Sequence, residues 1–109
     1  MSYVPDVGDI IYLDFDPQLG HEEAKRRPAL LLSPKAYNQK THLLICVPLT
    51  TKIKNYPFEV AIKAKLNSVA LSDQVKSLDW VARNAVFIQK ASQDELKSVK
   101  EKVALLLGI

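Results

Sequence analysis

The chain has 109 residues, of which 48% are hydrophobic and 25% charged, values typical of one folded domain and not of a disordered chain. Its formal net charge of +3 permits nucleic-acid binding without requiring it. The single cysteine, Cys46, excludes an internal disulfide and a thiolate metal cluster, as is usual in a reducing cytoplasm. No signal peptide and no apolar run as long as a membrane span is found, so we expect one cytoplasmic domain over 1–109.

Two short strands are expected near the N-terminus. Residues 9–15 alternate in polarity, which predicts a strand with Ile11, Leu13 and Phe15 facing the core. A short buried strand is expected at 29–33, where apolar residues follow a proline.

A highly charged loop, Gly-His-Glu-Glu-Ala-Lys-Arg-Arg-Pro at 20–28, separates these strands. Burying its uncompensated ions would cost several kcal/mol or more each, so we expect the loop at the surface. Loops held by a rigid strand often carry functional residues. From the loop alone, a simple solvated connection is the stronger interpretation, with Glu23 and Arg26 forming a weak surface ion pair.

The middle of the chain contains the longest apolar run, at 42–49, which predicts a central strand. Cys46 lies inside this run and is interpreted as a buried, inert thiol. Pro48 marks an edge or a bulge near the strand's end, and His42 is expected to be exposed at its start. Residues 34–41 form a helical turn or a tight loop.

A second exposed loop is expected at 50–57, followed by further short strands at 58–62, within 69–80 and at 85–88. Glu59 is interpreted as a solvated residue on an otherwise apolar strand. In all, about six or seven short strands predict a small, strongly bent antiparallel barrel or two packed sheets.

The C-terminal residues predict one helix that packs on this sheet. Ser92 and Glu95 have the spacing of a capping box, and Gly108 can end the helix in a left-handed conformation. An apolar stripe at helical spacing is formed by Leu96, Val99, Val103 and Leu106. The sequence therefore predicts an α+β fold, mainly antiparallel β, with a C-terminal helix.

The residue pattern excludes several chemistries and suits RNA. No glycine-rich phosphate loop, serine elbow or metal-binding histidine pair is present. Tyr56 can stack on an unpaired base, and Trp80 is better explained as core or dimer interface than as a stacking platform. Cations that can neutralise phosphates are present on both loops: Lys25, Arg26, Lys52 and Lys54.

RNA cleavage without a metal needs a base, a cation and an acid. Glu22 or His21 can act as the base, and Arg27 can hold the phosphate with its planar guanidinium. From residue types alone, a passive RNA-binding barrel and a protein-interaction domain remain open alternatives.

Five sequence blocks together resemble the MazF/PemK family of bacterial toxins from type II toxin–antitoxin pairs, and the MazF branch most closely. The blocks cover almost the whole chain in order: GDIIYLDFDP (8–17), GHEEAKRRP (20–28), VPLTT (47–51), YPFEV (56–60) and SDQVKSLDWVAR (72–83).

This resemblance implies a sequence-specific endoribonuclease that cleaves single-stranded mRNA without metal or cofactor. Attack by the 2′-hydroxyl would leave a 2′,3′-cyclic phosphate and a 5′-hydroxyl. It also implies a compact SH3-like barrel and a homodimer with RNA crossing the dimer surface. A labile MazE-like antitoxin would cover the RNA groove with its tail and would provide the only, indirect, link to DNA; no membrane is involved.

The resemblance also implies roles for individual residues. Glu22 and Arg27 match the acidic and arginine positions of the first loop, and Thr50 matches a threonine proposed to take part in proton transfer. His21 and Asp73 match positions implicated in the PemK-like branch.

The sequence departs from the PemK-like branch at one position, and some of the assigned residues have simpler interpretations. The PemK-like branch has an arginine two residues before the aspartate, and this chain has Leu71 there. Asp73 can equally close a turn, Thr50 can simply end a strand, and Gln74 is a candidate RNA contact. The alternative function is a toxin of the same fold that poisons a protein target such as a topoisomerase without cutting RNA.

Overall fold

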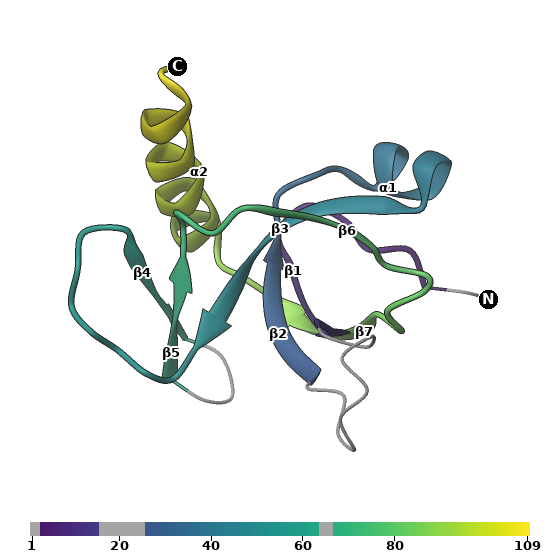
Figure 1. Cartoon of the computed structure of the whole chain (residues 1–109), viewed down its shortest axis with the longest axis horizontal. Helices are drawn as coiled ribbons and strands as arrows, with labels where there is room; N and C mark the ends of the chain where they lie inside the picture. Colours follow the sequence, from purple (N-terminus) through teal and green to yellow (C-terminus); the bar gives the residue numbers. More distant parts are fainter. Residues whose placement is uncertain (1–2, 16–25, 64–66) are drawn as a thin grey trace.

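The computed structural model describes residues 3–15, 26–63 and 67–109, which form seven strands and two helices (Figure 1). In chain order these are β1 (Asp9–Asp14), β2 (Arg26–Leu31), α1 (Lys35–Thr41), β3 (Leu43–Thr50), β4 (Glu59–Lys63), β5 (Asn67–Leu71), β6 (Lys76–Asp79), β7 (Val86–Lys90) and α2 (Gln93–Leu107). Neither helix is long and apolar enough to cross a membrane.

The strands form one antiparallel sheet in the order β4-β5-β3-β2-β1-β7, with β6 added beside β3. β3 is the central strand, as predicted, because it pairs with three others. One edge pairs with β2, while the other pairs first with β6 over Leu43–Cys46 and then with β5 at Leu49 and Thr50. On this second edge, Pro48 lies between the segment paired with β6 and the segment paired with β5, so its missing backbone N–H is tolerated there. The change of partner bends the sheet into a half-barrel, which confirms the predicted fold class.

Two hydrophobic clusters fill the two faces of the central strands. One contains Ile10 of β1 and includes the buried Val99 of α2; the other contains Ile11, Leu13 and Cys46. The predicted inward positions Ile11 and Leu13 are therefore confirmed. Ile10 is buried as well, on the opposite face of β1 from these two residues. An alternating pattern does not identify it, because a strand that is covered on both faces carries apolar residues on both.

The largest correction concerns where the first loop ends. β2 begins at Arg26, and its register places Arg26 opposite Asp14 and Arg27 opposite Leu13 of β1. The strand expected at 29–33 therefore starts earlier and ends at Leu31. The apolar pattern marked only the buried half of the strand, whereas pairing with β1 extends it into a charged, exposed half.

Both helices end at a residue with a left-handed backbone conformation. α1 occupies the segment where the sequence allowed a helical turn or a loop, and it ends at the exposed His42 in a left-handed conformation (φ 62°). The predicted capping box of α2 is confirmed, since Ser92 Oγ accepts from the Glu95 backbone N–H and Glu95 accepts from the Ser92 N–H. Gly108 ends α2 with φ 74°, as predicted.

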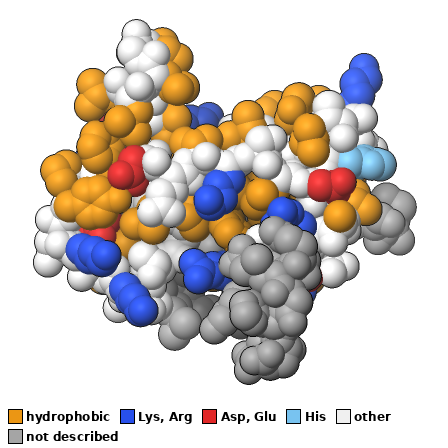
Figure 2. All heavy atoms as spheres, in the orientation of Figure 1, with side chains coloured by type: hydrophobic (Ala, Val, Ile, Leu, Met, Phe, Trp, Pro, Cys, Tyr) orange, Lys and Arg blue, Asp and Glu red, His pale blue; other side chains and the backbone are white. Residues whose placement is uncertain are grey.

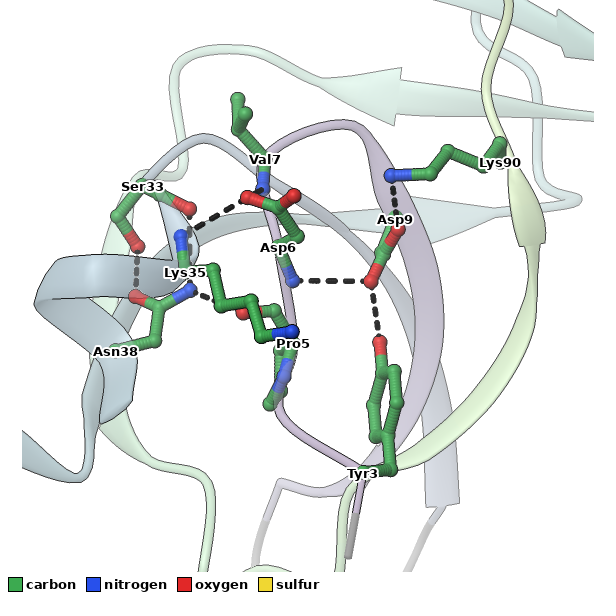
Figure 3. Close-up of polar contacts among 9 residues, drawn as sticks. All are labelled: Tyr3, Pro5, Asp6, Val7, Asp9, Ser33, Lys35, Asn38 and Lys90. Atoms are coloured by element: carbon green, nitrogen blue, oxygen red, sulfur yellow. Dashed lines mark hydrogen bonds and ion pairs between the residues drawn. The ribbon is translucent and has the colours of Figure 1, made fainter. Parts of the chain in front are cut away.

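An N-terminal polar network, shown in Figure 3, fastens residues 3–9 to the rest of the fold. The carboxylate of Asp9 is buried at the start of β1. It accepts hydrogen bonds from the Tyr3 hydroxyl (2.5 Å) and the Asp6 N–H (2.9 Å), and it forms an ion pair with Lys90 of β7 (2.8 Å). Burial, reinforced by Asp9, raises the pKa of Tyr3 well above its usual value.

The second part of this network holds α1. Asn38 is fully buried; its amide donates to the carbonyls of Pro5 (2.8 Å) and Ser33 (3.1 Å) and accepts from the Ser33 hydroxyl (2.6 Å). Its backbone carbonyl accepts from the indole N–H of Trp80 (2.9 Å). Trp80 is half-buried against the second hydrophobic cluster, in keeping with a core role. The N-terminal segment, α1 and the β6–β7 turn are thus joined by hydrogen bonds between buried or partly buried polar groups.

Candidate nucleic-acid interface

A groove of about 630 Å³ is lined by residues of β1, β2, β3, β5 and β7 and by the first residues after β3. Its polar lining consists of Arg26, Arg27, Thr50, Thr51, Lys52 and Ser68. Exposed apolar side chains line it as well, chiefly Tyr12, Val86 and Phe87. Figure 2 shows Lys and Arg side chains spread over the middle and lower parts of this face, with a further one at its upper right. The groove therefore combines cations with aromatic and aliphatic surface.

Arg26 is held at one side of the groove by three contacts. Its guanidinium forms an ion pair with Asp14 (3.3 Å), donates to the Asn84 carbonyl (3.0 Å) and lies 6.0 Å from the ring centroid of Tyr12. Asp14 also accepts from the Asn84 side chain (2.9 Å). The predicted pairing with Glu23 falls outside the described residues. Arg26 is thus held by neighbouring residues, and its charge is partly compensated.

Arg27 and Thr50 lie on neighbouring strands in this groove. The β2–β3 register pairs Ala29 with Pro48, and Arg27 and Thr50 lie two residues beyond that pair on their respective strands. Arg27 is exposed and has no ion pair or side-chain hydrogen bond with another described residue. Thr50 Oγ1 accepts from the Lys52 N–H (3.1 Å), which leaves its hydroxyl hydrogen available for donation.

The β6–β7 turn fixes the strand end beside the groove. Arg83 donates from Nη1 to the backbone carbonyls of Asp14 (3.0 Å) and Phe15 (2.5 Å) at the end of β1. The next residue, Asn84, adopts φ 55° and contacts both Asp14 and Arg26. This short turn therefore sets the position of β1 and of the first arginine of β2.

The second loop, residues 51–58, joins β3 to β4 and is held by side chains at its far end. Glu59 accepts from the backbone N–H groups of Lys54 (3.0 Å) and Asn55 (2.9 Å). The interpretation of Glu59 as a simply solvated residue is therefore wrong, because its carboxylate is used to order the loop. The Tyr56 hydroxyl contacts both oxygens of Asp73 (2.8 and 2.9 Å), and this bond raises the pKa of Tyr56 above its usual value.

The structure brings some of the predicted site residues together and separates others. Four of them line the groove: Arg26, Arg27, Thr50 and Lys52. Four others do not line it: Lys54, Tyr56, Asp73 and Gln74. The last three predicted residues lie outside the described part of the chain: His21, Glu22 and Lys25.

Sequence reasoning missed the apolar lining formed by Tyr12, Val86 and Phe87. Tyr12 was visible as an aromatic side chain on the outward side of an alternating strand, and it is 39% exposed. Val86 and Phe87 belong to an unbroken apolar run, which gives no indication of the face that meets solvent. A signal thus existed for Tyr12 but not for the other two.

The described residues contain no group of three or more His, Cys, Asp or Glu side chains placed to hold a metal ion. Cys46 is fully buried, and burial raises the pKa of its thiol to about 12. Because the thiolate is the reactive form, this residue is inert, as the sequence predicted.

Residues 6–107 match the family described as PemK-like, MazF-like toxin of type II toxin–antitoxin system. The chain belongs to this family. The match spans all the strands and helices from β1 to α2 and therefore includes every element that lines the groove.

Three relatives place the chain near the MazF members of the family. It is 50% identical to the endoribonuclease toxin MazF of Escherichia coli strain K12, over 97% of this chain and 96% of that protein. The crystal structure of MazF from Deinococcus radiodurans superposes with a TM-score of 0.89 at 45% identity, covering 99% and 100% of the two chains. A MazE–MazF crystal structure from the same organism gives a TM-score of 0.87 at 42% identity, with 99% of each chain covered. The predicted resemblance to the MazF branch is confirmed.

Proposed function

We propose that this chain is an endoribonuclease toxin of a toxin–antitoxin pair that cleaves single-stranded mRNA in the cytoplasm. The observation that carries the proposal is the placing of Arg27 and Thr50 on adjacent strands of a cationic, aromatic groove. The proposal is supported by 50% identity to an E. coli toxin named as an endoribonuclease, which also favours cleavage over poisoning of a protein target.

The groove has the properties that unpaired RNA requires. Arg27 and Lys52 can neutralise phosphates, while Tyr12 and Phe87 offer apolar surface to bases that are not stacked in a duplex. A base paired within a helix cannot reach such surfaces, so a single strand is the expected substrate.

The proposed reaction is an internal transfer at one phosphodiester. A base removes the proton from the 2′-hydroxyl, the 2′-oxygen bonds to phosphorus, and the bond from phosphorus to the 5′-oxygen breaks. The leaving oxygen takes a proton, so the products are a 2′,3′-cyclic phosphate and a 5′-hydroxyl. No step in this sequence requires a metal ion.

Arg27 stabilises the charge that develops on the phosphate oxygens, because its planar guanidinium can donate two parallel hydrogen bonds. Thr50, whose hydroxyl hydrogen is free of the bond to Lys52, takes part in proton transfer beside it. Glu22 and His21, which lie outside the described residues, are the candidates for the base.

A homodimer and an antitoxin complete the proposal. Leu105 (70%) and Leu107 (67%) of α2 and the following Ile109 (90%) are exposed apolar residues that a second copy would cover. The MazE–MazF structure, which is of related chains, supports a MazE-like antitoxin. An acidic tail with apolar residues would suit the same groove as RNA. Sedimentation of the free protein and of its Leu105→Asp variant tests the dimer.

The activity is tested by incubating the purified protein with a long single-stranded RNA in EDTA. Discrete fragments with 2′,3′-cyclic phosphate ends are expected, and primer extension then reads the cleaved sequence. Retarded but intact RNA would indicate passive binding, and RNA that is neither bound nor cut would support the protein-poisoning alternative.

A further inference from the structure

We propose that Glu59 and Asp73 are positioning residues that hold the 51–58 loop in the shape that binds RNA. They form what we call the carboxylate brace: Glu59 binds the loop backbone and Asp73 binds the Tyr56 hydroxyl. The inference rests on the proposed function, since the RNA is the substrate of that site.

The first half of the brace is Glu59, the first residue of β4. Its two carboxylate oxygens each accept one backbone N–H, from the consecutive residues Lys54 and Asn55. Asn55 has φ 60°, the left-handed conformation that turns these two N–H groups toward one anion. The Glu59 N–H in turn donates to the Tyr56 carbonyl (3.1 Å). Glu59 thus closes a compact turn by binding it from both its backbone and its side chain.

The second half is Asp73, which follows β5. Its carboxylate accepts the Tyr56 hydroxyl, so the tyrosine is tied to the β5–β6 turn although the two residues are 17 positions apart. The bond to Asp73 therefore holds the Tyr56 ring in place and occupies its hydroxyl group. Asp73 does not line the groove that contains Arg27 and Thr50, which argues for an action through Tyr56 and not on the scissile phosphate.

The near end of the loop is held at the groove. Thr50 accepts the Lys52 N–H, and Lys52 lines the groove. Ile53, which lies between this anchor and the brace, is exposed, and so is Lys54. Figure 1 shows the loop as a wide arch from β3 to β4, so without anchors at both ends its cations would be spread over many positions. Ordering the loop before binding lowers the entropy cost of contact with RNA.

A brace of this kind affects binding more than chemistry. Losing it should raise KM, because fewer molecules hold Lys52 and Lys54 in the competent arrangement. The value of kcat should change little, since Arg27 and Thr50 are positioned by β2 and β3.

The decisive experiment compares Tyr56→Phe, Asp73→Ala, Asp73→Asn and the Tyr56→Phe/Asp73→Ala double variant on a single-stranded RNA substrate in EDTA. We expect Tyr56→Phe and Asp73→Ala each to raise KM about tenfold, equivalent to about 1.4 kcal/mol, with kcat within about twofold of wild type. The double variant should match the single ones, because both remove the same bond. Asp73→Asn keeps an oxygen acceptor and should restore KM to within about threefold of wild type.

A catalytic Asp73 would give the opposite result: Asp73→Asn would lower kcat as much as Asp73→Ala, and it would do so in the Tyr56→Phe background as well. That outcome overturns the proposal for Asp73.

Glu59 is tested by Glu59→Ala and Glu59→Gln, with Glu101→Gln on the exposed side of α2 as the matched control. Glu59→Ala loses both backbone bonds and should raise KM the most, Glu59→Gln keeps one acceptor and should lie between it and wild type, and the control should not change. Unchanged KM in Glu59→Ala with an unaltered urea midpoint contradicts the inference. If wild type does not cut RNA, the proposed function fails, but gel retardation of the same variants still tests the brace through their affinity.

Discussion

The N-terminal polar network and the groove contain the same kinds of side chain but differ in how these are paired. In the network, Asp9 is 3% exposed and its carboxylate contacts Tyr3, the Asp6 N–H and Lys90. In the groove, Arg27 is exposed and is paired with no other described residue. Asp9 thus has its partners within the chain, whereas the Arg27 guanidinium is presented to solvent.

This difference separates stability from binding. Buried polar groups that are hydrogen-bonded hold a fold together, and removing one leaves its partners unsatisfied at a substantial cost. Exposed cations contribute little to stability but can neutralise a polyanion. The role of a charged residue therefore depends less on its charge than on whether its partner lies within the chain or in a ligand.

The largest effect is expected from removing the cation Arg27 from the groove. Arg27→Ala should lower the rate of RNA cleavage by about 10²–10³-fold, because loss of one donor to a developing oxyanion has that size of effect. Single-turnover cleavage measures the rate, and the urea midpoint should be unchanged because Arg27 is not in the core. An Arg27→Ala protein that cuts at the wild-type rate would end this assignment.

A comparable change in the network should act on stability alone. Asn38→Ala removes the amide that binds Pro5 and Ser33, and we expect a loss of about 2–4 kcal/mol in the free energy of unfolding. Urea denaturation checks this, with Gln39→Ala, the exposed neighbour on α1, as the control. Folded Asn38→Ala should cleave RNA normally; slower cleavage at full stability would contradict the separation of the two regions.

A smaller effect is expected from a single groove cation. Lys52→Gln should weaken RNA affinity several-fold and reduce the slope of log affinity against log salt by about 0.7, the value for one phosphate contact on a single strand. Titrations of binding over a range of salt concentrations measure the slope. An unchanged slope would show that Lys52 does not contact a phosphate.

The smallest effect concerns pH and the network. The Lys35 backbone N–H, helped by that of Val7, lowers the pKa of Asp6 below its ordinary value of 3.8. A lowered pKa stabilises the fold above the unfolded value, and this contribution is lost as the pH falls through the folded value. Asp6→Asn should therefore lower the free energy of unfolding by under about 1 kcal/mol at neutral pH, because the Asp6 carboxylate is exposed to solvent, and by less at a pH below 3.8. Urea denaturation at both pH values measures the difference, and an equal loss at both would contradict it.

Sequence patterns alone predicted most of the strands and the C-terminal helix. The apolar run that became β3, the capping box of α2 and the buried thiol of Cys46 are local features, and each is dictated by neighbours in sequence. The candidate loops were also visible, because dense charge cannot be buried. The position of Arg27 on a strand was not, since pairing with β1 extends β2 beyond its apolar half.

Tertiary structure decided which charges act together. Residue types named Arg27, the family resemblance added Thr50 and Asp73, and Glu59 was interpreted as a solvated residue; none of this said which of them share a surface. The fold brings Arg27 and Thr50 to one groove through the pairing of β2 and β3, and it ties Asp73 to Tyr56 instead. Local patterns are set by a few neighbouring residues, whereas the meeting of distant side chains depends on strand register, which only the complete packing of the sheet fixes.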